Sequence, residues 1–137
     1  MLCGDPSKDS NTYFAGCDKG KISPVSRPDN IIFDRKGNLW IATDGQPTSL
    51  KRNDGIYAVP VQGPDRGFVR QFLSAVAGAE VASLDMTPDN RSLFAAIQHP
   101  GEGSKNLDPA NLTSRWPDGD FPRPSVIAIT EPNLIGT

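Results

Sequence analysis

Several residue types are scarce in this 137-residue sequence, and each shortage excludes a class of protein. Basic residues form no cluster larger than the pair Lys51-Arg52, and the net charge is −2, which argues against a nucleic-acid-binding surface. No apolar run approaches the roughly 18 residues of a membrane-spanning helix. The N-terminus has neither the basic nor the apolar stretch of an export signal. We therefore expect no nucleic-acid partner, no membrane span and no signal peptide in this chain.

Cysteine and histidine are also scarce, which limits metal sites built from soft ligands. Cys3 and Cys17 cannot complete a four-ligand zinc site, and only His99 could assist them. We expect both cysteines to be free thiols. A disulfide between them is the next alternative, and metal binding by either is the least favoured one.

Proline and glycine, by contrast, are abundant, with 13 of each. They interrupt long helices and favour short strands joined by turns. Runs of β-branched and aromatic residues lie between the turn residues. The strands that these runs predict are 30–33, 39–43, 55–61, 68–73, 81–86, 91–98 and 125–130. The sequence thus predicts an all-β protein, with helix confined to short turns in the loops.

The predicted strands fall into two similar units. Each has a strand, a polar turn and a Leu-aromatic-x-Ala motif, at 39–42 and again at 93–96. Units of about 40–50 residues with four strands are typical of β-propeller blades. We predict a partial β-propeller of about two four-stranded antiparallel blades, residues 27–74 and most of a second at 78–132. The second unit lacks its outermost strand, and a β-sandwich is the alternative fold.

Blade geometry brings two acids together. The innermost strands of adjacent blades begin on one face of a propeller, so Asp29 and Glu80 are expected to approach each other near its axis. The loops 44–54 and 99–123 are expected to cover the same face. Carboxylate oxygens suit Ca²⁺, which takes 6–8 donors. We predict a partial metal site of Asp29 and Glu80, with Asn30 as a weaker candidate. Alternatively, Asp29 caps the turn after Pro28 and Glu80 is a solvated acid.

Three further polar residues lie in the predicted covering loops. Arg52 and Arg123 are weak candidates for bidentate phosphate binding, and solvated surface arginines are the alternative. His99 could act as a base or ligand, but we favour a structural role in hydrogen bonding. The sequence identifies no catalytic residue. Trp40, Trp116 and Phe94 are expected to pack between blades.

A family resemblance runs through nearly the whole chain. The matching segments are Cys3-Gly4-Asp5-Pro6, Phe14-Ala15-Gly16, Ser23-Pro24, Pro28-Asp29-Asn30, Gly37 to Gly45, Asn53-Asp54-Gly55, Gly78-Ala79-Glu80, Gln98 to Glu102 and Trp116 to Gly119. In this order they resemble the final third of PhoX-type alkaline phosphatases. One departure is Arg27, which stands where relatives often have a small residue.

The resemblance implies a six-bladed propeller that hydrolyses phosphate monoesters with calcium and iron at its axis. It also implies export of the full-length parent to the periplasm, and hence a start missing from this chain. The family's iron-binding cysteine lies in earlier blades without a counterpart here, so iron binding is not assigned to Cys3 or Cys17. Asp29 and Glu80 match family positions at the axial mouth.

Two other functions remain as alternatives. The chain could belong to a calcium-dependent lactonase or esterase of the gluconolactonase/regucalcin type, since the motif Pro-Asp-Asn with Gly-Asn-Leu-Trp is shared by many propellers. It could also be a non-catalytic propeller fragment. Even as part of a phosphatase, the isolated chain is expected to have little or no activity, because most of the ring and its ligands are missing. We also expect its uncovered blade faces to promote self-association.

Overall fold

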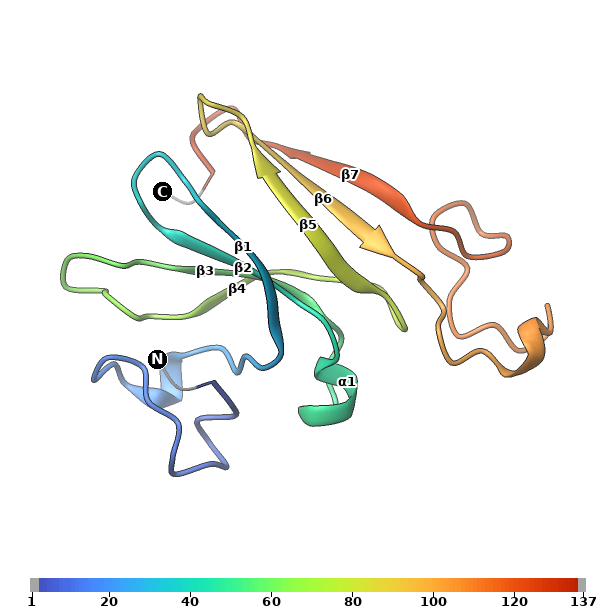
Figure 1. Ribbon diagram of the computed structural model, residues 1–137, viewed down its shortest axis with the longest axis horizontal. Helices are drawn as coiled ribbons and strands as arrows, with labels where there is room; N and C mark the ends of the chain where they lie inside the picture. Colours follow the sequence, from blue (N-terminus) through green and yellow to red (C-terminus); the bar gives the residue numbers. More distant parts are fainter. Residues whose placement is uncertain (1–2, 136–137) are drawn as a thin grey trace.

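The computed structural model describes residues 3–135 and is built almost entirely from short β-strands (Figure 1). The strands are β1 (Pro28–Phe33), β2 (Leu39–Thr43), β3 (Gly55–Val59), β4 (Arg70–Ser74), β5 (Glu80–Met86), β6 (Ser92–Gln98) and β7 (Ser125–Thr130). Helix is limited to the single turn α1 (Gln46–Ser49) and two 3₁₀ turns at Lys19–Lys21 and Lys105–Leu107. The predicted all-β class is confirmed. Within residues 3–135, no helix is long and apolar enough to cross a membrane.

The strands form two antiparallel sheets in simple chain order. The first sheet has the order β1-β2-β3-β4, and the second has the order β5-β6-β7. Both groupings agree with the predicted units, including the missing fourth strand of the second. Strand β3 stops at Val59, one residue before Pro60, which has no N–H to donate to a ladder. The division into blades and the size of any complete ring stay predictions.

A hydrophobic core lies between the two sheets. From the first sheet it takes Trp40, Ala42 and Ile56, and from the second Val81, Leu84, Leu93, Ala95 and Ile97. Trp40 is completely buried, its Nε1–H donates to Asp34 Oδ2 at 3.1 Å, and its ring meets Phe72 edge-on at 5.0 Å. Its predicted place between the sheets is confirmed. Trp116 packs half-buried against this same core.

The N-terminal segment covers the other face of the first sheet. Its side chains Phe14, Ile22 and Val25 form a second core with Tyr57 and Val69. Within this segment, Gly4 and Val25 form an isolated antiparallel β-bridge. This irregular segment therefore takes the place of a packed neighbour on that face.

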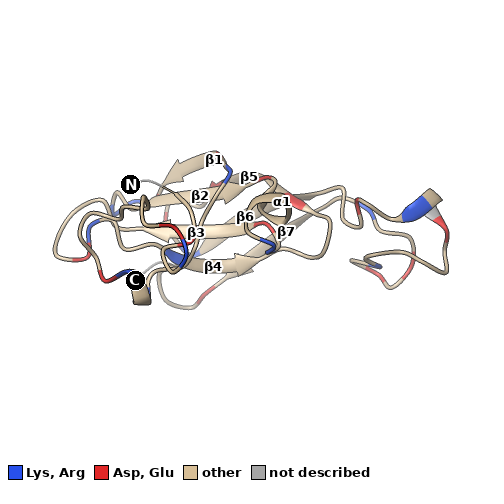
Figure 2. Ribbon diagram, turned by 90° about the horizontal axis from the view of Figure 1, so that it is seen from below, with Lys and Arg blue, Asp and Glu red and all other residues tan. Residues whose placement is uncertain are grey.

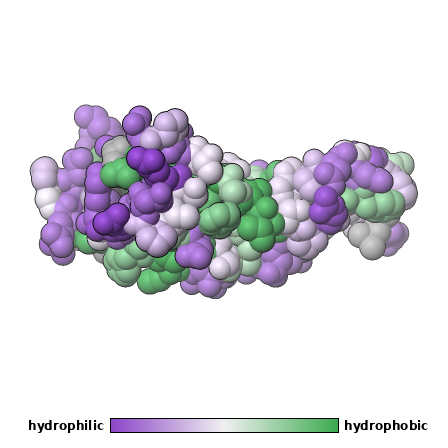
Figure 3. Space-filling model, turned by 90° about the horizontal axis from the view of Figure 1, so that it is seen from above, coloured by the Kyte–Doolittle hydropathy of each residue, from purple (hydrophilic) through white to green (hydrophobic). Residues whose placement is uncertain are grey.

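The corresponding face of the second sheet is open. Phe94 is 40% exposed and Val126 is 69% exposed, because alternate residues of β6 and β7 point away from the core. Phe94 thus does not pack between the two described sheets, contrary to our expectation. Figure 3 shows apolar surface over this sheet, beside the more polar surfaces to either side.

The long connection between β6 and β7 projects away from both sheets (Figure 2). Its base is fixed to the body by hydrogen bonds from the Gly101 amide to the Ala77 carbonyl at 2.9 Å and from the Glu102 amide to the Gly78 carbonyl at 3.3 Å. Further along the connection, Trp116 packs against the core. At the other end of the sheets, the buried Ile135 follows β7 and its amide donates to the Asn90 carbonyl at 2.8 Å.

Candidate functional site

A pocket of about 230 Å³, with several carboxylates in its lining, lies between loops of the first sheet and the first residues of the second. It is lined by parts of the loop 44–54, by residues 78–80 and by residues 99–103. The expectation that these loops share one end of the sheets is therefore confirmed for their lining residues. The remainder of the 99–123 loop extends outward and does not contribute to the lining.

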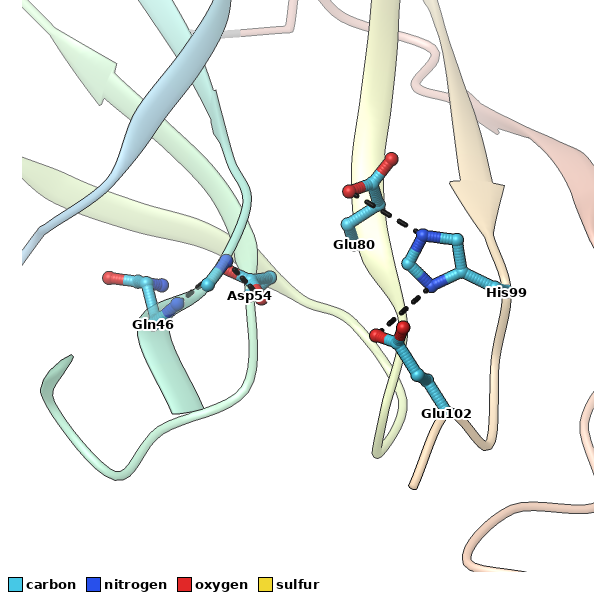
Figure 4. A network of polar contacts seen from close by, with 6 residues as sticks. Gln46, Asp54, Glu80, His99 and Glu102 are labelled. Carbon is cyan, nitrogen blue, oxygen red and sulfur yellow. Dashed lines mark hydrogen bonds and ion pairs between the residues drawn. The ribbon is translucent and has the colours of Figure 1, made fainter. Parts of the chain in front are cut away.

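The buried carboxylate of Asp54 holds one wall of this pocket in shape. It accepts hydrogen bonds from Thr43 Oγ1 at 2.8 Å and from the amides of Gly45 and Gln46 at 3.0 Å (Figure 4). These bonds fold the chain after β2 into α1. They also fix the backbone next to Asp44, whose amide donates to the Arg27 carbonyl at 3.1 Å.

Glu80 lies on the opposite wall, at the first residue of β5. Its side chain is only 11% exposed, so Glu80 is not the solvated acid of the alternative interpretation. His99 Nε2 lies 3.6 Å from Glu80 Oε2, and His99 Nδ1 lies 3.5 Å from Glu102 Oε2 (Figure 4). Within the described chain, the buried Nδ1 atom has no hydrogen-bond partner. His99 thus stands between two carboxylates, and its Nδ1 atom is close to Glu102 without forming a hydrogen bond.

The environment of Glu80 disfavours its charged form. Burial is the largest cause that raises the pKa of its carboxyl group, followed by a hydrogen bond and like-charge repulsion from Asp44. His99 lowers this pKa, and the more distant charge of Asp29 raises it again. A buried carboxyl group that repels its neighbours is stabilised as an anion when a cation binds between them.

The structure places the other predicted metal-site residues on β1. Asp29 is exposed and lies within the strand rather than capping a turn. With its amide nitrogen facing the surrounding acceptors, Asn30 donates to Asp29 Oδ2 at 3.0 Å and to the Ala82 carbonyl of β5. The first strands of the two sheets are therefore linked beside Glu80, as the blade geometry predicts.

Sequence reasoning overlooked Asp44, which interacts with Glu80 more strongly than Asp29 does. Asp44 belongs to the first sheet's loop and Glu80 to the second sheet, so their carboxyl groups meet across the gap between sheets. The signal was present in the sequence, because Asp44-Gly45 directly follows a strand that ends on the predicted axial face.

The family model of alkaline phosphatase PhoX matches residues 1–101 of this chain. The chain belongs to the PhoX alkaline phosphatase family. The solved structure of Pseudomonas fluorescens PhoX in complex with vanadate, a transition state analogue, is similar with a TM-score of 0.70 and 30% sequence identity. That match covers 98% of this chain but only 23% of the PhoX chain. A comparison with curated protein sequences finds no significant match.

The PhoX family match includes Asp44, Asp54 and Glu80 of the pocket and ends at residue 101, one residue before Glu102. The projecting loop and β7 lie beyond residue 101 and are covered by the structural similarity alone. The chain spans less than a quarter of the matched PhoX structure. The resemblance inferred from the sequence motifs is thus confirmed at the level of the family.

The two predicted phosphate-binding arginines do not line this pocket. Arg52 is exposed in the loop 44–54, and Arg123 forms an ion pair with Asp118 in the projecting loop. Binding of phosphate by Arg123 would compete with that ion pair. Their role in substrate binding stays a prediction.

The two cysteines are free thiols and lie against the second core, on the far side of the first sheet. Burial raises the pKa of the Cys3 thiol, and the nearby N-terminus lowers it by a smaller amount. This placement separates both thiols from the carboxylates of the pocket.

The side chains that line the pocket provide only some of the ligands that a hard cation requires. Their oxygen chemistry suits Ca²⁺, and the Nδ1 atom of His99, which forms no hydrogen bond, adds a polar group near Glu102. However, no group of three or more His, Cys, Asp and Glu residues within 3–135 is placed to hold a metal ion by itself. The described residues of the pocket could therefore supply at most part of a coordination shell.

Proposed function

We propose that this chain forms part of a metal-dependent alkaline phosphatase that hydrolyses phosphate monoesters. The observation that carries the proposal is the meeting of Glu80 and Asp44 across two sheets of a chain in the PhoX family. Membership of that family favours phosphatase chemistry over the lactonase alternative. The solved relative contains vanadate, a transition state analogue.

Glu80 and Asp44 are proposed to hold calcium, with Asp29 and Asn30 as neighbouring oxygen donors. A bound cation would supply Lewis-acid stabilisation of the charge that develops on a phosphoryl group. Asp54 would keep Asp44 in position through its bonds to the loop backbone. His99 would hold the carboxylate of Glu80 in place from the opposite side.

The remaining parts of the function follow from the family resemblance. Iron is proposed for the full-length parent but is not assigned to a residue of this chain. Arg52 and Arg123 are proposed as phosphate contacts, and a periplasmic or secreted location is proposed for the parent. Residues 27–74 and 78–132 would be two blades of its propeller. The uncovered sheet faces favour self-association of the 137-residue chain.

A graft into the solved relative tests the proposal. Residues 1–137 would replace the matching part of Pseudomonas fluorescens PhoX, and the chimera would be assayed with p-nitrophenyl phosphate in the presence of calcium and iron. We expect metal-dependent hydrolysis by the chimera and little or none by the isolated chain. A lactone serves as the control substrate. A folded chimera that cleaves only the lactone, or neither substrate, would contradict the proposal.

A further inference from the structure

Strand β7 is an unprotected edge strand. Its sequence Ser125 to Thr130 contains no charged residue and no proline, and it pairs with β6 in continuous register without a bulge. Natural edge strands usually carry a charged residue, a proline or a bulge, because an open row of N–H and C=O groups recruits other strands. Among residues 3–135, no strand pairs with the outer side of β7.

The hydrogen-bonding groups on the open side can be identified from the end of the strand. The Glu131 amide donates to the Arg91 carbonyl at 3.1 Å, so it points toward β6. In an antiparallel ladder the direction alternates from residue to residue. The amides and carbonyls of Val126, Ala128 and Thr130 therefore point to the open side. Three donors and three acceptors are thus presented along one short edge.

We propose that two copies of this chain associate by antiparallel pairing of their β7 strands, centred on Ala128. In this register Ala128 faces Ala128 of the second copy, and Val126 faces Thr130 of the second copy. Every outward amide and carbonyl of both strands is then used. The two three-stranded sheets become one continuous six-stranded sheet.

The charges near the strand ends favour a second copy as the occupant. The paired segment itself is uncharged, so two copies meet without repulsion along the ladder. Glu131 and Arg123 lie just beyond its two ends. In the proposed register, Glu131 of one copy and Arg123 of the other are diagonal neighbours on one face, within reach of long side chains. Arg123 also pairs with Asp118 of its own copy, so Glu131 of the second copy would share its guanidinium group at each end of the ladder.

The exposed apolar face beside the edge supports the same arrangement. Val126 and Phe94 lie on the face of the second sheet that no described segment covers. Side-by-side pairing brings this face of one sheet next to the same face of the other. Val126 of each copy then lies beside Ala128 and Thr130 of the other copy, which partly shields it from water and adds hydrophobic stabilisation to the ladder.

Sedimentation velocity over a concentration series tests for the dimer. We expect the 137-residue chain to form a dimer that Ala128→Pro weakens about tenfold or more, because proline removes the central amide from both copies. Ala128→Val keeps this amide and should leave the dimer intact. Far-UV circular dichroism would check that both variants keep their sheets. A wild-type monomer throughout, or equal association of both variants, would overturn the proposal.

Cysteine cross-linking tests the register independently of folding stability. In a background with Cys3→Ser and Cys17→Ser, a short thiol cross-linker should join two copies through Ala128→Cys. It should not join copies that carry Val126→Cys alone, whereas Val126→Cys combined with Thr130→Cys should cross-link. Efficient cross-linking by the single Val126→Cys variant, or none by Ala128→Cys, would show that the strands do not pair in this register.

Discussion

The backbone amide of Arg35 donates a hydrogen bond of 3.2 Å to the side-chain oxygen of Asn90. The two residues are 55 positions apart and belong to equivalent turns of the two sheets. The bond therefore joins the turns at the end opposite the pocket, where the sequence pattern placed both of them. Asn90 is buried and has a positive φ of 56°, a conformation that asparagine tolerates better than most residues.

Replacement of Asn90 by alanine should destabilise the chain. The Arg35 amide would lose its acceptor, and loss of such a part-buried hydrogen bond costs about 0.5–1.5 kcal/mol. The left-handed backbone would add about 1 kcal/mol for an alanine. Asn90→Gly serves as the control, because glycine removes the acceptor but accepts the backbone. Urea denaturation should rank stability as wild type, then Asn90→Gly, then Asn90→Ala, and equal stability of all three would contradict this role.

Replacement of Glu80 by glutamine should have opposite effects on stability with and without calcium. Without calcium, Glu80→Gln should raise the melting temperature, because it removes a buried carboxylate that Asp44 repels. With calcium, the variant should gain less stability than the wild type, since a charged ligand is lost. Glu102→Gln is the control, because its side chain is 71% exposed, and its effects should be milder. An unchanged calcium response in Glu80→Gln would remove Glu80 from the proposed ligands.

The raised pKa of Glu80 also predicts a pH dependence for the calcium-free chain. The folded state binds a proton at Glu80 more tightly than the unfolded state does, because burial and Asp44 raise this pKa. The contribution of Glu80 to stability is therefore complete below the ordinary glutamate pKa and is lost as pH rises through the raised value. The difference in the free energy of unfolding between wild type and Glu80→Gln should change across that window. A constant difference would contradict the shift.

Gly78 should be intolerant of any side chain. Its φ is +72°, and an added Cβ would lie 2.5 Å from the Glu102 carbonyl oxygen and 2.6 Å from its amide nitrogen. Gly78→Ala should push the 101–102 backbone away, which displaces His99 and Glu102 from Glu80. Gly37→Ala is the matched control, since Gly37 has a φ of +80° with nothing within 4 Å.

We expect Gly37→Ala to cost about 1–2 kcal/mol from backbone strain alone. Gly78→Ala should cost roughly 1–3 kcal/mol more, from overpacking. Only Gly78→Ala should also weaken calcium binding, measured by isothermal titration calorimetry. Equal destabilisation by both variants would show that the close approach to residue 102 is not maintained in solution.

The thiol of Cys3 should react slowly. Because burial raises its pKa, less of the reactive thiolate is present at neutral pH than in an exposed cysteine. In a Cys17→Ser variant, alkylation of Cys3 by iodoacetamide at pH 7.5 should be slower than alkylation of a cysteine-containing unstructured peptide. Mild urea below the unfolding transition should leave this rate unchanged, and a rate equal to that of the peptide would contradict burial.

Strand positions were predictable because each depends on a local alternation of residues. The hairpins around 35–38 and 88–91 have clear polar turns between β-rich runs, and they appear as predicted. The N-terminal cover was not predictable. Phe14, Ile22 and Val25 are isolated among polar residues, and only their contacts with Tyr57 reveal that they form a core.

In the pocket too, some residues could be predicted from the sequence pattern and others only from their tertiary contacts. Glu80 was predicted from its place at the start of an inner strand, which topology determines, whereas Asp29, predicted in the same way, does not line the pocket. Asp44 was not predicted, because a loop side chain can point in many directions until other bonds restrict it. The bonds of Asp54 to Gly45 and Gln46 provide that restriction, and none has a recognisable spacing in the sequence.

The carboxyl groups of Asp44 and Glu80 lie on different sheets, and this division links cation binding to the docking of the sheets. A cation held by both groups favours the docked arrangement by the same free energy by which docking favours the cation. In that case the core around Trp40 would influence the affinity for the cation, since it holds the two sheets together. Conversely, loss of the cation would loosen the contact between sheets before it disturbed either sheet internally.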